Sequence, residues 1–158
     1  MKTNAARILD KLGIGYRLAS HAVDEDDLSA AGLAKSIGED PATIFKTLVL
    51  RGDKTGPMVC VIPGDSELDL KKAAKASGNK SCTMLPLREL RGVTGYIRGG
   101  CSPLGMKKRF PTYIHASALD QKEVFISAGL RGLQLVLAPG DLVAAAEATV
   151  ADLTHKDE

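Results

Sequence analysis

The chain has 158 residues, of which 44% are hydrophobic and 25% charged, and its formal net charge is +2. This length and composition predict a globular protein with a hydrophobic core and exclude a low-complexity or strongly charged chain. No apolar run is long enough for a transmembrane helix, and the N-terminus lacks the apolar core of a signal peptide, so we expect a cytoplasmic protein.

The first part of the chain predicts two helices, a short strand and a hairpin. Thr3 or Asn4 can cap the first helix, and Gly13 ends it. The run IFKTLVL is apolar enough for a strand covered on at least one face, and the turn RGDKTG joins it to the next strand. The predicted ranges are helix 4–12, strand 16–19, helix 28–37, strand 44–50 and strand 58–62.

The second part begins with a lysine-rich helix that Asp69 can cap and Gly78 can end. A glycine-rich segment over residues 95–111 is too interrupted to be one regular element. Pro139 and Asp141 begin an alanine-rich final helix. The predicted ranges are helix 70–77, strand 81–84, helix 87–92, strands 112–115, 123–127 and 133–137, and helix 139–153.

This order of elements lacks the regular alternation of strand and helix that a doubly wound fold requires. It predicts the α+β class, with a mixed, partly closed, barrel-like β-sheet surrounded by helices. No repeat, low-complexity tract or linker interrupts the chain. We therefore expect residues 1–158 to form a single domain.

Lys46 lies inside the predicted strand 44–50, on the same face as three aliphatic residues. Its stem can extend along apolar surface so that the ammonium reaches the sheet edge, or the ammonium can enter a cavity. A cavity lysine must meet an anion or a carbonyl dipole, or lose its proton. Lys46 is therefore a candidate functional residue.

The segment GGCSPLGMKKR, residues 99–109, is the second candidate. Its glycines allow backbone N–H groups to approach a ligand closely, and successive N–H groups can bind a carboxylate, a phosphate or a developing oxyanion. A plain turn is the alternative, and the segment is neither a Walker P-loop nor a dinucleotide-binding fingerprint. Ser127, at the end of an apolar strand, can bind a ligand or cap a turn.

The cysteines and histidines predict no metal site, and we expect no cofactor. Three cysteines are an odd number with no C-x-x-C spacing, and the three histidines are scattered. Cys60 and Cys82 fit core positions, and we interpret Cys101 as a small residue of a pocket wall rather than a nucleophile.

Taken together, the strand FKTLVL, the helix LDLKKAAKASG, the segment GYIRGGCSPLGMKKRFPT and the late stretch FISAGLRGLQLVLAPGDL resemble the YbaK/ProX-type aminoacyl-tRNA deacylases. These are the free-standing relatives of the editing domain of prolyl-tRNA synthetase. The resemblance covers nearly the whole chain and is strongest to the YbaK branch, whose members hydrolyse cysteinyl-tRNA for proline.

The resemblance implies a trans-acting editing hydrolase that cleaves the ester of a mischarged tRNA. It implies catalytic roles for Lys46, Gly100 and Ser102, through substrate positioning and oxyanion stabilisation or with attack by the substrate's own thiol. It implies tRNA, most simply tRNA for proline, as partner, with prolyl-tRNA synthetase as a further partner. The substrate-binding residues it implies are His21, Thr47, Gly99, Cys101, Pro103 and Ser127.

Two positions of this chain depart from the YbaK pattern. YbaK-type members have a tyrosine where this chain has Ser20-His21, and often an aspartate where it has Gln134. These departures leave the reaction class intact and bear on which amino acid is preferred. Two other functions remain open on the residues alone. The pocket can bind a tRNA end or nucleotide without turnover, or Lys46 can form a Schiff base with a carbonyl substrate.

Overall fold

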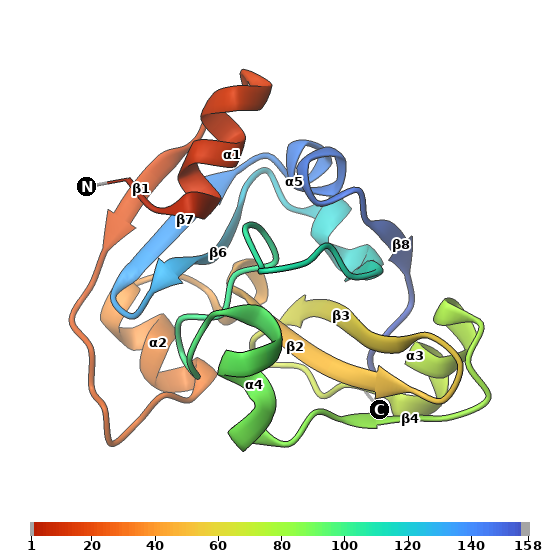
Figure 1. Ribbon diagram of the computed structural model, residues 1–158. Helices are drawn as coiled ribbons and strands as arrows, with labels where there is room; N and C mark the ends of the chain where they lie inside the picture. The colour runs from red at the N-terminus through yellow and green to blue at the C-terminus, as the bar shows by residue number, and fades with distance from the viewer. Residues whose placement is uncertain (1, 156–158) are drawn as a thin grey trace.

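The computed structural model describes residues 2–155, which fold into the α+β arrangement of Figure 1. The helices are α1 (Asn4–Leu12), α2 (Ala30–Ile37), α3 (Leu70–Ser77), α4 (Leu87–Thr94) and α5 (Pro139–Ala146), with short 3-10 helices η1 (Pro41–Thr43) and η2 (Ala116–Asp120). The strands are β1 (Arg17–Ser20), β2 (Phe45–Gly52), β3 (Gly56–Pro63), β4 (Cys82–Met84), β5 (Thr112–His115), β6 (Val124–Leu130), β7 (Leu133–Leu137) and β8 (Thr149–Ala151).

The strands form two sheets rather than the one partly closed sheet that we expected. An antiparallel sheet has the order β1-β7-β6, and a mixed sheet has the order β4-β2-β3-β5-β8. A single parallel bridge between Ile44 and Phe125 joins them in the described residues. Ile44 immediately precedes β2, and β2 itself pairs with β3 and β4. The α+β class is confirmed, and no closed barrel is seen within residues 2–155.

The alternation of side chains along the hairpin β2–β3 separates two hydrophobic cores. Phe45 packs with Val59 and Val61 in the core that also contains α1 and β6. Leu50 packs on the opposite face with Cys60 and Ile62, against α3. Because strand residues alternate between faces, Lys46 is placed on the face of Leu48 and Leu50, as the sequence predicts.

The predicted helix caps are confirmed for the first and third helices. The Thr3 side chain accepts a hydrogen bond from the N–H of Ala6, and the Asp69 carboxylate accepts from the N–H groups of Lys71 and Lys72. Both helices end at a glycine in the left-handed conformation.

The prediction of a final helix over residues 139–153 is wrong in its second half. The helix α5 ends at Ala146, and Glu147 takes a left-handed conformation with φ 49°. Residues Thr149–Ala151 then form β8, which pairs in parallel with β5. Thr149 and Val150 are β-branched, so they favour this sheet edge over another helical turn.

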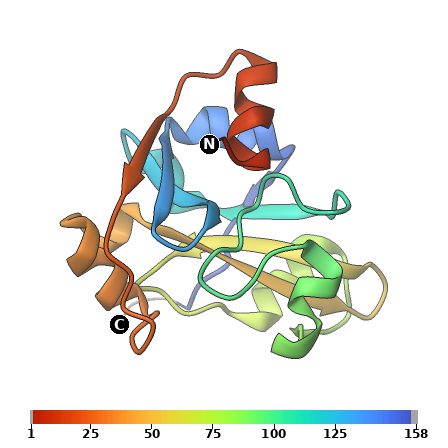
Figure 2. The same ribbon diagram turned by 60° about the vertical axis from the view of Figure 1, so that its left-hand side comes forward.

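The glycine-rich segment crosses the molecule as an irregular loop after α4. Figure 2 shows it between α4 and the connection from β1 to α2. No helix among residues 2–155 has the length and apolar character needed to cross a membrane.

Candidate functional site

A cleft of about 330 Å³ opens beside the first half of β2. β4 pairs only with Leu50, Arg51 and Gly52, so it leaves the earlier part of that strand edge uncovered. Both sheets, α2 and the glycine-rich loop supply the walls. The lining residues are Leu28, Ser29, Leu33, Ile44, Phe45, Lys46, Thr47, Leu48, Gly64, Arg98, Gly99, Cys101, Ser127 and Gln134.

Lys46 brings a partly desolvated cation into this cleft. Its Nζ donates to the carbonyl oxygen of Gly64 at 3.3 Å, a long contact that leaves donor capacity for a ligand. Burial lowers the pKa of the Lys46 ammonium, and the carboxylates of Glu67 and Asp65 partly offset this effect. The side chain therefore lies in the cleft and does not extend into bulk solvent.

Thr47 and Ser127 add two hydroxyls to the cleft lining. The Thr47 Oγ1 is shielded from solvent and has no hydrogen-bond partner among the described residues. The Ser127 Oγ accepts from the N–H of Gly129 at 3.1 Å, beside an irregularity in the pairing of β6 and β7. An unpartnered, shielded hydroxyl is costly, which favours a ligand contact at Thr47.

Gly99 and Cys101 form the loop wall of the cleft. Gly99 has φ 83°, and a Cβ there would lie 3.2 Å from the Arg131 Nε. That Nε donates to the Arg98 carbonyl oxygen at 2.8 Å, which ties the loop to the turn between β6 and β7. A glycine is needed at position 99 both for the backbone conformation and for this close approach.

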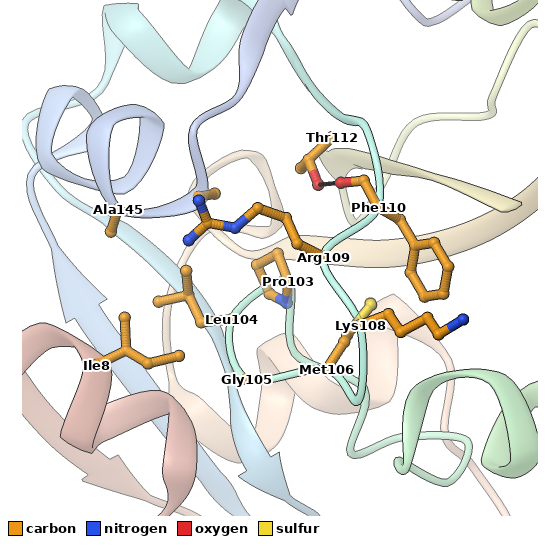
Figure 3. A pocket seen from close by; sticks show the side chains of 11 residues that line it. Ile8, Pro103, Leu104, Gly105, Met106, Lys108, Arg109, Phe110, Thr112 and Ala145 are labelled. Atoms are coloured by element: carbon orange, nitrogen blue, oxygen red, sulfur yellow. Dashed lines mark hydrogen bonds between the residues drawn. The ribbon is translucent and has the colours of Figure 1, made fainter. Parts of the chain in front are cut away.

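Gly100, Ser102 and Pro103 lie behind this wall and do not line the cleft. The Gly100 N–H donates to the Ile97 carbonyl at 3.0 Å, and the fully buried Ser102 accepts from the Leu104 N–H at 3.2 Å. Pro103 lines a separate cavity of about 140 Å³ between the loop, α1 and α5, shown in Figure 3. Their catalytic or binding roles stay predictions.

Tyr96 fixes the shape of the loop, a role that the sequence alone did not indicate. Its hydroxyl donates to the Leu104 carbonyl at 2.6 Å. Its ring lies against two glycines in the left-handed region, because a Cβ at Gly105 would be 2.7 Å from the hydroxyl and one at Gly129 would be 3.0 Å from the ring. Burial raises the pKa of Tyr96 to about 12, so it remains a neutral donor.

Cys101 is not equipped to act as a nucleophile. Burial raises the pKa of its thiol to about 12, although a hydrogen bond with Thr94 partly opposes this. The nucleophilic form of cysteine is the thiolate, which is scarce at neutral pH in such an environment. This supports its interpretation as a wall residue.

His21 lies at one side of the cleft and contacts Gln134, which lines it. The His21 Nδ1 is 3.0 Å from the Ala22 carbonyl, and its Nε2 is 3.3 Å from the Gln134 Nε2. A proton on Nδ1 satisfies both contacts, because Nε2 then accepts from the amide. The two positions that depart from the YbaK pattern are therefore neighbours in space.

The structure thus brings Lys46, Thr47, Gly99, Cys101 and Ser127 together, with His21 adjacent. Several lining residues were not predicted from the sequence, namely Arg98, Gly64, Leu33 of α2, and Leu28 and Ser29 just before that helix. Gln134, one of the two positions that depart from the YbaK pattern, lines the cleft because β7 pairs it with Ser127. In the described part of the chain, no group of three or more His, Cys, Asp or Glu side chains is arranged to hold a metal ion.

Comparison with known proteins places this cleft in a family context. Residues 24–145 match the model of the aminoacyl-tRNA editing domain. A protein of Enterococcus faecalis (strain ATCC 700802 / V583), EbsC, named as a Cys-tRNA(Pro)/Cys-tRNA(Cys) deacylase, is 51% identical over 99% of this chain and 95% of its own length.

Two solved structures share the fold. One, described as a trans-editing enzyme for prolyl-tRNA synthetase, has a TM-score of 0.83 at 28% identity, covering 95% of this chain and 94% of that one. Another, the hypothetical protein APE2540, has a TM-score of 0.85 at 26% identity, covering 94% of this chain and 97% of that one. With the family model matched across most of its length, the chain belongs to the YbaK/ProX aminoacyl-tRNA editing domain family.

Proposed function

We propose that this protein is a trans-editing deacylase that hydrolyses the ester of mischarged Cys-tRNA(Pro), with residues 1–158 acting as one editing domain in the cytoplasm. The observation that carries the proposal is the half-buried Lys46 ammonium in a cleft of about 330 Å³. The relative at 51% identity is named for the deacylation of the same substrate, which supports the assignment of Cys-tRNA(Pro).

The chemistry needs no protein nucleophile. An aminoacyl ester is already activated, so positioning and charge stabilisation suffice to accelerate its cleavage. Lys46 either polarises the ester carbonyl or holds an oxygen of the terminal adenosine, while Thr47 and Ser127 contact the aminoacyl group. Gly100 and Ser102 shape the loop wall on which Gly99 and Cys101 are presented.

Two nucleophiles are compatible with this cleft. Water can add to the carbonyl carbon, with release of free amino acid. Alternatively the substrate sulfur attacks its own carbonyl carbon, the bond to the 3′ oxygen breaks, that oxygen takes up the thiol proton, and water then opens the resulting thiolactone. The second route excludes proline and alanine because they lack a thiol, whereas discrimination by size alone reaches roughly 10–200-fold.

The test is a deacylation screen with tRNA for proline carrying cysteine, alanine or proline, and with Cys-tRNA(Cys). We expect rapid release from Cys-tRNA(Pro) and a loss of about 10²–10³-fold in the rate constant for the Lys46→Ala variant. Lys75→Ala, an exposed lysine on α3, is the matched control. Saturable tRNA binding with no release from any substrate would instead identify a binding module.

A substrate carrying 2-aminobutyrate separates the two nucleophiles. Its side chain has a methyl group where cysteine has the thiol, so it is close to cysteine in size but cannot attack the carbonyl. Hydrolysis at the rate of the cysteine ester would assign the step to water, and resistance to hydrolysis would assign it to the substrate thiol. The same screen, run with and without prolyl-tRNA synthetase, tests whether that enzyme acts as a partner.

A further inference from the structure

A second groove continues from the cleft along the other side of Arg98 and Gly99. It has a volume of about 280 Å³ and shares Thr47, Leu48, Arg98, Gly99 and Cys101 with the cleft. We propose that this groove, which we call the α4 groove, binds the single-stranded 3′ nucleotides that precede the terminal adenosine; this proposal rests on the proposed function. An aminoacyl group placed against Lys46 has to continue into an RNA strand, and the α4 groove is contiguous with the cleft.

The floor of the α4 groove is apolar and open. Met84 from β4 and Leu87 and Leu90 from α4 line it together with Leu48. The exposed fractions are 45% for Met84 and 59% for Leu87, and Ile97 nearby is 47% exposed. Large apolar side chains that gather at the surface beside polar groups mark an interaction site. Unpaired bases present apolar faces that such a surface can cover.

The rim of the α4 groove is cationic. Arg98 is exposed on the loop and lines the groove, and the exposed Arg91 of α4 lines an adjoining hollow together with Leu87, Leu90 and Arg98. Arg88 is also exposed, three residues before Arg91 and therefore on the same side of α4. None of the three forms an ion pair within residues 2–155, unlike Arg51, which pairs with Glu89 at 2.9 Å. Exposed guanidinium groups without a carboxylate partner are suited to phosphate oxygens.

An apolar floor with a cationic rim matches a single RNA strand, in which bases and phosphates alternate. The chain has no Trp and only three Phe and three Tyr, so the bases would rest on aliphatic side chains and guanidinium planes. Such contacts are tolerant of base identity. The strand end common to all tRNAs would therefore be bound here without selection among tRNAs.

The test uses binding of uncharged RNA, which does not depend on turnover. One probe is an acceptor-stem hairpin with a single-stranded end in CCA, and the other is the same hairpin cut back to a blunt end. We expect the wild-type protein to bind the overhang hairpin more tightly. The Arg88→Gln/Arg91→Gln variant should reduce the salt slope of that binding by about 0.7 for each phosphate that the protein no longer neutralises. Leu87→Ser should weaken it about fivefold or more.

Lys71→Gln/Lys75→Gln, an exposed pair on α3 away from the groove, is the matched control and should leave the overhang binding unchanged. Equal affinity of the wild type for both hairpins, or no binding of either, would overturn the proposal. So would an equal loss for both hairpins in the α4 variants, which would place the contacts on the duplex. An effect of Leu87→Ser that arises only with added synthetase would show that the α4 groove takes a protein instead.

Failure of the proposed function has a different signature. A protein that binds the overhang hairpin through the α4 groove but releases no amino acid would retain this inference and lose the hydrolytic one.

Discussion

Lys46 combines a functional position with a cost to folding. Burial lowers the pKa of its ammonium, so the folded state binds the proton less tightly than the unfolded state does. Below the folded-state pKa the charged side chain therefore reduces the free energy of unfolding. That loss is recovered as the pH rises through the folded-state pKa toward the ordinary value of 10.5.

We expect Lys46→Met to raise the free energy of unfolding at pH 7 by up to about 1 kcal/mol, since the half-exposed ammonium keeps part of its hydration. Methionine retains the apolar stem and removes the charge. Urea denaturation of both proteins measures the difference, and Lys71→Met, at an exposed site, is the control. A clear decrease in stability would show that the carbonyl of Gly64 and the nearby carboxylates outweigh desolvation.

Among the elements, the glycine-rich loop depends on the contacts of Tyr96, a residue far from Lys46 in the sequence. Tyr96 donates to the Leu104 carbonyl and fills the space beside Gly105 and Gly129. These contacts set the path of the backbone at Gly99 and Cys101. Tyr96 thus helps to hold the loop wall of the cleft, together with the hydrogen bond from Arg131 to the Arg98 carbonyl.

Tyr96→Phe should lower the free energy of unfolding by about 1–2 kcal/mol, because it leaves a partly buried carbonyl without its donor. Tyr113→Phe is the matched control, since no hydrogen bond of the Tyr113 hydroxyl is found among residues 2–155. Thermal or urea denaturation gives the comparison. Equal effects of the two substitutions would mean that the Tyr96 hydroxyl does not hold the loop.

Elements governed by neighbouring residues could be predicted from the sequence, and those governed by distant partners could not. Asp69 and Gly78 mark the two ends of α3 through local contacts. The alternation of residues around Lys46 correctly predicts the face of β2 on which it lies. The alanine-rich stretch after Pro139 has high helix propensity, yet residues Thr149–Ala151 pair with β5, more than thirty residues earlier.

The residues of the candidate site divide in the same way. Lys46, Gly99 and Ser127 belong to patterns that the sequence displays. Arg98 and Gly64 line the cleft only because two sheets and a loop converge there, and no local sequence pattern indicates that convergence.

At the scale of the whole molecule, the His115 side chain holds the residues that follow the last strand, β8. Its Nδ1 accepts from the Leu153 N–H at 3.1 Å, and its Nε2 lies 3.3 Å from the Thr154 hydroxyl. Burial lowers the pKa of His115, with the Asp152 carboxylate opposing this and the Lys72 ammonium adding to it. A proton on Nδ1 would remove the acceptor that holds Leu153.

Stability should therefore fall as the pH drops through the unfolded-state value of 6.5 toward the lower folded-state pKa, because the unfolded chain takes up the proton first. The slope that one proton contributes is at most about 1.4 kcal/mol per pH unit. Urea denaturation from pH 7.5 to pH 5 measures it. His115→Asn should flatten the profile, and an unchanged slope in that variant would assign the pH dependence to other groups.

The single bridge between Ile44 and Phe125 has a further consequence. Ile44 immediately precedes β2, and Lys46 lies two residues further along the chain, so the junction of the two sheets adjoins the candidate site. A molecule seated there would touch Thr47 of one sheet and Ser127 and Gln134 of the other. It would act as a noncovalent cross-link between the two sheets, which share little backbone hydrogen bonding. Binding of a ligand should therefore make the two sheets harder to separate.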